Sequence, residues 1–109
     1  MEDQREVLAR LTARLVEYAQ PRRVILFGSY ARGTAQAGSD IDLLVVADGP
    51  FGAQRPRSAE LQRLQSAVAD VRVPKDIILC SSAEHEEWRS AVNHVIARAE
   101  QEGIVLYER

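Results

Sequence analysis

The stretch FGSYARGTAQAGSDIDLLVV, residues 27 to 46, joins a glycine–serine turn to two aspartates that begin an apolar run. Asp40 and Asp42 are two positions apart, and in an extended strand such side chains lie on the same face. A partly buried carboxylate is costly unless it is paired or binds a metal, and a second negative charge nearby raises that cost. The pattern therefore predicts a positive group between the two aspartates.

The turn before the aspartates has the features of a phosphate site. Gly28 lets a ligand approach the backbone, while Ser29 supplies a hydroxyl and begins a helical turn whose free N–H groups favour an anion. The aspartates offer hard oxygen ligands that suit Mg²⁺. A phosphate cradle opposite a carboxylate pair is the arrangement that phosphoryl or nucleotidyl transfer needs, because metal ions can stabilise both the attacking and the leaving oxygen.

Length and composition narrow the class of protein. A chain of 109 residues is long enough for one domain, expected over 1–109, with its own core. A single cysteine excludes an intramolecular disulfide and fits a reducing compartment. With a net charge of −2, the chain lacks the positive charge by which duplex-binding proteins attract the phosphate backbone, so no direct nucleic-acid binding is expected. No signal peptide or membrane span is recognisable, and we expect a soluble, cytoplasmic protein.

The hydrophobic pattern predicts strands that alternate with helices, and hence a small α/β or α+β fold with a mixed sheet flanked by helices. One long helix is expected from a capping box at Ser81 and Glu84 to Gly103, with Trp88 and Val92 on its apolar face. The other predicted elements are a helix over 3–19, strands over 24–27, 40–46 and 75–80, a helical turn over 30–32, a helix through 61–71 and an edge strand over 104–108.

In the opening stretch, Gly28-Ser29 is followed after ten residues by Asp40-Ile41-Asp42. This pattern resembles the signature of the DNA polymerase β-like nucleotidyltransferase superfamily. "GSYARG" together with "SDIDLLV" is similar to its smallest branch, the minimal nucleotidyltransferases (MNT). The likeness continues through "RVILFGSYARG" and the closing "EGIVLYER", so it covers essentially the whole chain.

The resemblance implies a set of site residues. Gly28 and Ser29 would hold the phosphates of ATP, and Asp40 and Asp42 would hold Mg²⁺, with two ions expected. Asp76 in "PKDIIL" matches the third acidic ligand by position and would help to activate the acceptor hydroxyl, although Asp70 or Asp48 could be argued instead. Arg32 would either reach the triphosphate or tie its loop to an acidic neighbour.

The resemblance also implies a partner. Small members of this branch act as antitoxins to HEPN toxins and can transfer AMP onto a tyrosine of that partner, so a complex with such a toxin is expected. Two alternatives stay open. One is a small-molecule nucleotidyltransferase of the antibiotic-modifying kind, although those usually carry an additional substrate-binding domain. The other is a binding module that neutralises its partner by contact and keeps the acids as a relic.

Other residues are expected to be structural. "HEEWR" at 85–89 lacks the second histidine of the zinc motif H-E-x-x-H. Arg89 and His94 have the spacing of HEPN-type ribonucleases, but two residues match easily by chance. His85 and His94 are expected on the surface, and Trp88 in the core. Cys80 is expected to be buried and inert, with Tyr30 and Ser39 as packing and turn residues.

Overall fold

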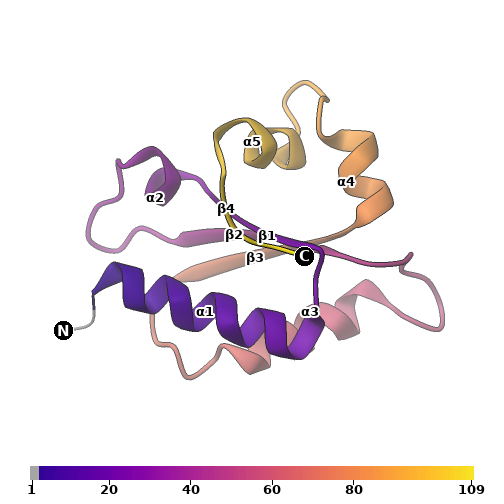
Figure 1. Cartoon of the computed structure of the whole chain (residues 1–109), viewed down its shortest axis with the longest axis horizontal. Coiled ribbons are helices and arrows are strands. Elements are labelled where there is room, and N and C mark those ends of the chain that lie inside the picture. The colour runs from indigo at the N-terminus through magenta and orange to yellow at the C-terminus, as the bar shows by residue number, and fades with distance from the viewer. Residues whose placement is uncertain (1–2) are drawn as a thin grey trace.

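The computed structural model describes residues 3–109, which form a four-stranded sheet with helices on both faces (Figure 1). The mixed α/β architecture confirms the predicted fold class. In chain order the elements are α1 (Gln4–Ala19), β1 (Arg23–Phe27), α2 (Ser29–Arg32), β2 (Ile41–Ala47), α3 (Arg57–Ala67), β3 (Lys75–Ser81), α4 (Ser82–Trp88), α5 (Val95–Glu102) and β4 (Ile104–Glu108).

Strand pairing brings the two halves of the opening motif together. The strand order is β3-β2-β1-β4, with β2 antiparallel to β1 and parallel to β3. In this register Phe27 is opposite Asp42, and Asp42 is opposite Asp76. The glycine turn after β1 and the acids at the starts of β2 and β3 therefore meet at one end of the sheet. The last strand, β4, lies at the sheet edge as predicted.

Both faces of the sheet are covered, which explains why the second strand is an almost continuous apolar run. In Figure 1, α1 and α3 lie below the sheet, and α4 and α5 lie above it. Leu43 and Val45 belong to the core on the α1–α3 side, whereas Leu44 and Val46 belong to the core on the α5 side. Because strand side chains alternate, Asp42 shares the α5 side with Leu44.

The first helix follows its local sequence signals. Asp3 is the N-cap, and its side chain accepts a hydrogen bond from the Arg5 N–H. The helix ends where Gln20 adopts a left-handed conformation just before Pro21. Leu11 and Leu15, four positions apart on one face of the helix, are fully buried, whereas Tyr18 near its end is 66% exposed.

The single helix predicted from Ser81 to Gly103 is wrong, because the chain forms two helices, α4 and α5. The capping box at Ser81 and Glu84 does start α4. The chain then leaves the helix, Asn93 takes a positive φ of 59°, and the His94 side chain accepts a hydrogen bond from Ile96 N–H to start α5. Polar residues that favour turns and caps therefore override the helical spacing of the apolar residues. Val92, expected on the apolar face, is 87% exposed.

The structure also shows the surroundings of three side chains in and after β3. Trp88, expected in the core, is 40% exposed and stacks on His94 with ring centroids 4.6 Å apart. His85, expected on the surface, is buried. Cys80 is buried as predicted, and this burial raises the pKa of its thiol to about 12, which makes it a poor nucleophile. Within residues 3–109, no helix has both the length and the apolar character needed to cross a membrane.

Candidate active site

The glycine turn lies directly against the middle aspartate of the motif. Gly28 has φ 73° and ψ −155°, a conformation that is essentially restricted to glycine. A Cβ atom at this position would lie 2.1 Å from Asp42 Oδ2. Glycine is therefore needed both for the backbone conformation and for the close approach of the carboxylate.

A cleft of about 450 Å³ opens beside this contact, between the end of the sheet and α5. Of the residues predicted for the site, five line it, and Asp40 lies outside the lining as an exposed residue just before β2. Asp76 lines the cleft together with Ile78, and it is opposite Asp42 in the pairing of β2 with β3. Its place in the register agrees with its match, by position, to the third acidic ligand. The lining consists of Phe27, Gly28, Ser29, Arg32, Asp42, Asp76, Ile78, Val95, Arg98 and Glu102.

Electrostatics in the cleft disfavour a charged Asp42. Partial burial raises the pKa of the Asp42 carboxyl, and the charges of Asp76 and Asp40 raise it further. The positive charges of Arg32 and Arg98 oppose this effect without cancelling it. A cation between the carboxylates would remove the repulsion, as the sequence predicts.

The acidic residues suit a magnesium ion by their chemistry. Asp42 and Asp76 are carboxylate oxygen donors on paired strands in one cleft, and the charge of Asp40 reaches Asp42. Residues 3–109 contain no group of three His, Cys, Asp or Glu side chains already gathered closely enough to hold a metal ion. Asp40 and Asp76 are both exposed, and the three carboxylates would have to come closer together to hold one ion.

Arg32 takes up the second of its two expected roles in this structure. Its Nη1 lies 3.1 Å from Glu102 Oε1, and the same oxygen accepts a hydrogen bond of 3.2 Å from the Gly28 N–H. Glu102 thus ties the glycine turn to the end of α5. The pairing gives Arg32 an acidic partner, and Ser29 lines the cleft beside it.

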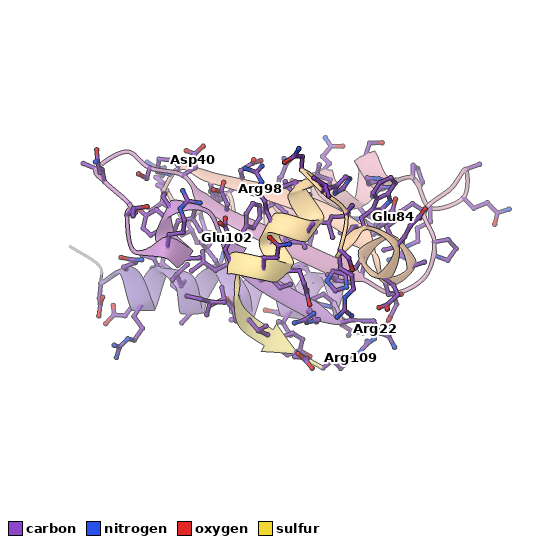
Figure 2. The ribbon with its side chains drawn as sticks, turned by 90° about the horizontal axis from the view of Figure 1, so that it is seen from above. Arg22, Asp40, Glu84, Arg98, Glu102 and Arg109 are labelled. Atoms are coloured by element: carbon purple, nitrogen blue, oxygen red, sulfur yellow. The ribbon has the colours of Figure 1, made fainter. Side chains whose placement is uncertain are left out.

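Sequence reasoning missed two residues of this cleft, Arg98 and Glu102. Both are on α5, one helical turn apart, and Figure 2 shows them at the same end of the molecule as Asp40. Glu102 contacts a residue 74 positions earlier in the chain. Their four-residue spacing could have suggested a shared helix face, but nothing local indicates that this face meets the glycine turn.

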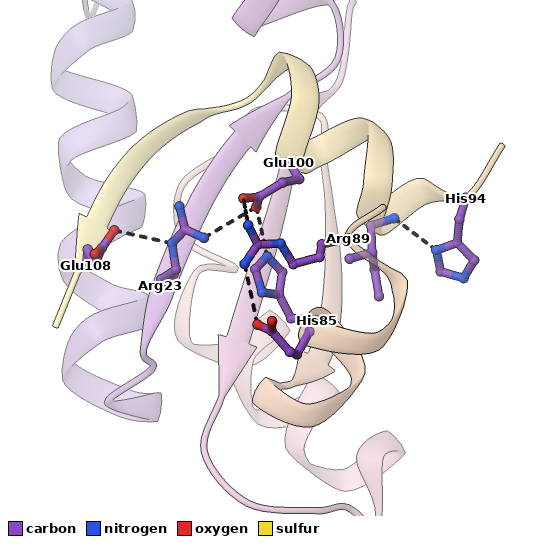
Figure 3. A network of polar contacts seen from close by, with 8 residues as sticks. Arg23, His85, Arg89, His94, Glu100 and Glu108 are labelled. Atoms are coloured by element: carbon purple, nitrogen blue, oxygen red, sulfur yellow. Dashed lines mark hydrogen bonds and ion pairs between the residues drawn. The ribbon is translucent and has the colours of Figure 1, made fainter. Parts of the chain in front are cut away.

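A polar network holds α5 on the sheet (Figure 3). Glu100 Oε2 lies 2.9 Å from His85 Nε2 and 3.4 Å from Arg23 Nη1, which connects α5 to α4 and to β1. Burial by itself would raise the pKa of Glu100, but the hydrogen bond with His85 and the charge of Arg23 outweigh burial and lower it. This network fixes the helix that carries Arg98 and Glu102.

Residues 8–106 match the family described as nucleotidyltransferase domain. The chain belongs to this family. The match spans both halves of the motif and all four strands except the last two residues of β4. No curated protein sequence matches the chain significantly.

Solved structures share the nucleotidyltransferase fold. A candidate nucleotidyltransferase from Sulfolobus solfataricus is 22% identical with a TM-score of 0.59, over 97% of this chain and 84% of that chain. A mutant of the toxin–antitoxin pair MntA–HpeT, with two aspartates two positions apart changed to glutamate, is 19% identical with a TM-score of 0.65. A toxin–antitoxin complex with AMP-PNP is 22% identical with a TM-score of 0.57. The last two matches each cover 94% of this chain and 73% of the other.

Proposed function

We propose that this nucleotidyltransferase domain transfers AMP from ATP, with Mg²⁺, to the hydroxyl of a tyrosine on a HEPN-type toxin with which it forms a complex. Family membership supports nucleotidyl transfer. The likeness of fold to a toxin–antitoxin pair, and to such a complex with AMP-PNP, supports a nucleotide substrate and a toxin partner.

The observation that carries the proposal is the contact between Gly28 and Asp42, with Asp76 next in register. It puts an approachable backbone and a hydroxyl within one cleft with two carboxylates. Nucleotidyl transfer needs phosphate-binding groups next to metal-binding acids, because the reacting α-phosphate must contact both. A purely structural turn would not need a buried glycine against a carboxylate whose pKa is raised.

Each residue has a role in the proposed reaction. Gly28 and Ser29 bind and orient the triphosphate, and Asp40, Asp42 and Asp76 hold the magnesium ions, which stabilise negative charge on the phosphates when they are bound. The tyrosine oxygen forms a bond to the α-phosphorus while the bond from that phosphorus to the β-phosphate oxygen breaks, and pyrophosphate leaves. The tyrosine proton passes to Asp76 and then to solvent.

The exposure of the cleft favours a macromolecular acceptor. Asp40, Asp76 and Arg98 are all exposed at the same end of the sheet. A side chain presented on another protein could therefore reach Asp76 without crossing the core.

The test is to incubate the protein with ATP, Mg²⁺ and the proposed HEPN-type toxin partner, and to measure the partner's mass and toxicity. We expect an added mass of one or more adenylyl groups on tyrosine and a loss of toxicity. Asp42→Asn should produce neither, because it removes a metal ligand while keeping the side-chain volume. Asp70→Asn, a surface acid paired with Arg14 on the opposite face, should transfer AMP as the wild type does.

Two outcomes would contradict the proposal. Equal neutralisation of the toxin by wild type and Asp42→Asn, without a mass change, would mean that contact alone is the mechanism. Transfer of AMP to an aminoglycoside or another small alcohol, with none to protein, would keep the site assignment and remove the toxin as acceptor.

A further inference from the structure

The cleft contains two arginines with different surroundings. Arg32 is paired with Glu102 at 3.1 Å. Arg98 lines the same cleft, yet its guanidinium has no hydrogen bond or ion pair with any residue between 3 and 109. Its charge does act on Asp42, where it opposes, without cancelling, the rise in the pKa of that carboxyl.

The lack of an ion pair at Arg98 is unexpected from its position on the helix. Glu102 is one turn further along α5, at the spacing that normally favours an arginine–glutamate pair. Glu102 Oε1 instead accepts from Gly28 N–H and pairs with Arg32. The contacts of the glycine turn thus draw the Glu102 carboxylate away from Arg98, which lines the cleft without an ion pair.

A triphosphate bound at Gly28 and Ser29 needs a cation on the side away from the aspartates. The carboxylates of Asp42 and Asp76 come from the sheet, whereas Arg98 comes from the helix that covers it. A guanidinium binds phosphate oxygens with short, charge-assisted hydrogen bonds, often two at once.

We propose that Arg98 binds the β- and γ-phosphates of the nucleotide, and that Glu102 is a positioning residue that holds Arg32 and the glycine turn. This inference rests on the proposed function, because it assumes that a nucleoside triphosphate enters this cleft. It assigns the phosphate-binding charge to the last helix instead of to the turn that carries Arg32. Arg98 then distinguishes a triphosphate from a monophosphate or a nucleoside.

The test compares Arg98→Gln with the wild type by calorimetric titration of ATP, inorganic tripolyphosphate and adenosine in the presence of Mg²⁺. We expect the Kd for ATP and for tripolyphosphate to rise about tenfold or more, since a charged hydrogen bond is lost, and the Kd for adenosine to stay unchanged. Arg98→Lys should recover part of the loss. Arg63→Gln is the matched control, because Arg63 is an exposed arginine of α3 on the opposite face, and its affinities should equal those of the wild type.

Each contrary result identifies what failed. If wild type and Arg98→Gln bind ATP equally, Arg98 has no phosphate role while the proposed function stands. An equal loss of affinity for ATP and adenosine would mean that the substitution disturbs the cleft instead of removing a phosphate contact. If the wild type binds neither ATP nor tripolyphosphate with Mg²⁺, the proposed function fails and this inference fails with it.

Discussion

At the scale of single residues, Gly28 combines a backbone conformation that is essentially restricted to glycine with a close approach to Asp42. Gly28→Ala should lower the free energy of unfolding by about 2 to 4 kcal/mol, because it adds backbone strain and a collision with the carboxylate. Gly33→Ala is the matched control, since Gly33 also has a positive φ but nothing within 4 Å of an added Cβ. Urea denaturation measures the free energy of unfolding of both variants. Equal losses of stability would contradict the close contact between Gly28 and Asp42.

The carboxylates themselves should cost stability when no metal is bound. Partial burial, and then repulsion by Asp76 and Asp40, raise the pKa of Asp42. Asp40→Asn together with Asp42→Asn removes both costs, so at pH 7 without metal the double variant should be as stable as the wild type or up to about 1 kcal/mol more stable. Asp70→Asn should instead destabilise, because Asp70 pairs with Arg14 and its pKa is lowered. Denaturant titration measures the free energy of unfolding of each variant and so distinguishes a gain of stability from a loss. A clear loss of stability in the double variant would make the two acids structural residues.

At the scale of elements, the start of α4 predicts a pH dependence. Glu84 accepts from Arg57 Nη1 and from Ser81 N–H, each at 2.8 Å, and the Arg57 pairing above all lowers the pKa of Glu84 from 4.5 to about 2. A lowered pKa stabilises the fold above pH 4.5, and this stabilisation is lost as the pH falls toward 2. Glu84→Gln should therefore cost about 1 to 2 kcal/mol at pH 7, and the difference from wild type should shrink steadily below pH 4.5.

Denaturation at several pH values measures this difference, with Glu87→Gln on the exposed face of the same helix as the control. The control should follow the wild type at every pH. A Glu84→Gln penalty that is the same at pH 3 and pH 7 would contradict the assigned pKa.

The end of α5 depends on a second close approach of glycine. A Cβ on Gly103 would lie 2.1 Å from the Ala99 carbonyl oxygen and 2.3 Å from Ile25 Cγ2. Gly103→Ala should cost about 1 to 3 kcal/mol, because backbone and core atoms would have to shift. Gly52→Ala, which meets nothing within 4 Å, should leave thermal stability almost unchanged. If both variants melt at the wild-type temperature, the helix end is less tightly packed than described.

Sequence patterns predicted the features that neighbouring residues determine. The turn at Gly28, the face of Asp42 and the capping box at Ser81 all depend on spacings of a few residues, and each is found in the structure. The prediction of one long helix was wrong because the chain leaves the helix after Trp88, and the segment before α5 contains Asn93 with a positive φ. Glu102 was missed because it contacts residues 70 and 74 positions away, and no local pattern indicates such contacts.

At the scale of the whole molecule, α5 is the element that completes the cleft. Its Glu100 is anchored to α4 and β1, its Glu102 is tied to the glycine turn, and its Arg98 faces the aspartates of the sheet. The cleft is thus assembled from residues that lie far apart in the chain.

The central claim is that the glycine turn and the aspartates form one site for a nucleotide with its metal. Calorimetric titration of ATP into wild type and into Asp40→Asn with Asp42→Asn, each with and without Mg²⁺, tests it most directly. We predict that Mg²⁺ tightens ATP binding to the wild type at least tenfold and has no such effect on the double variant. Equal affinities for the two proteins in Mg²⁺, or wild-type binding that does not depend on Mg²⁺, would contradict the claim.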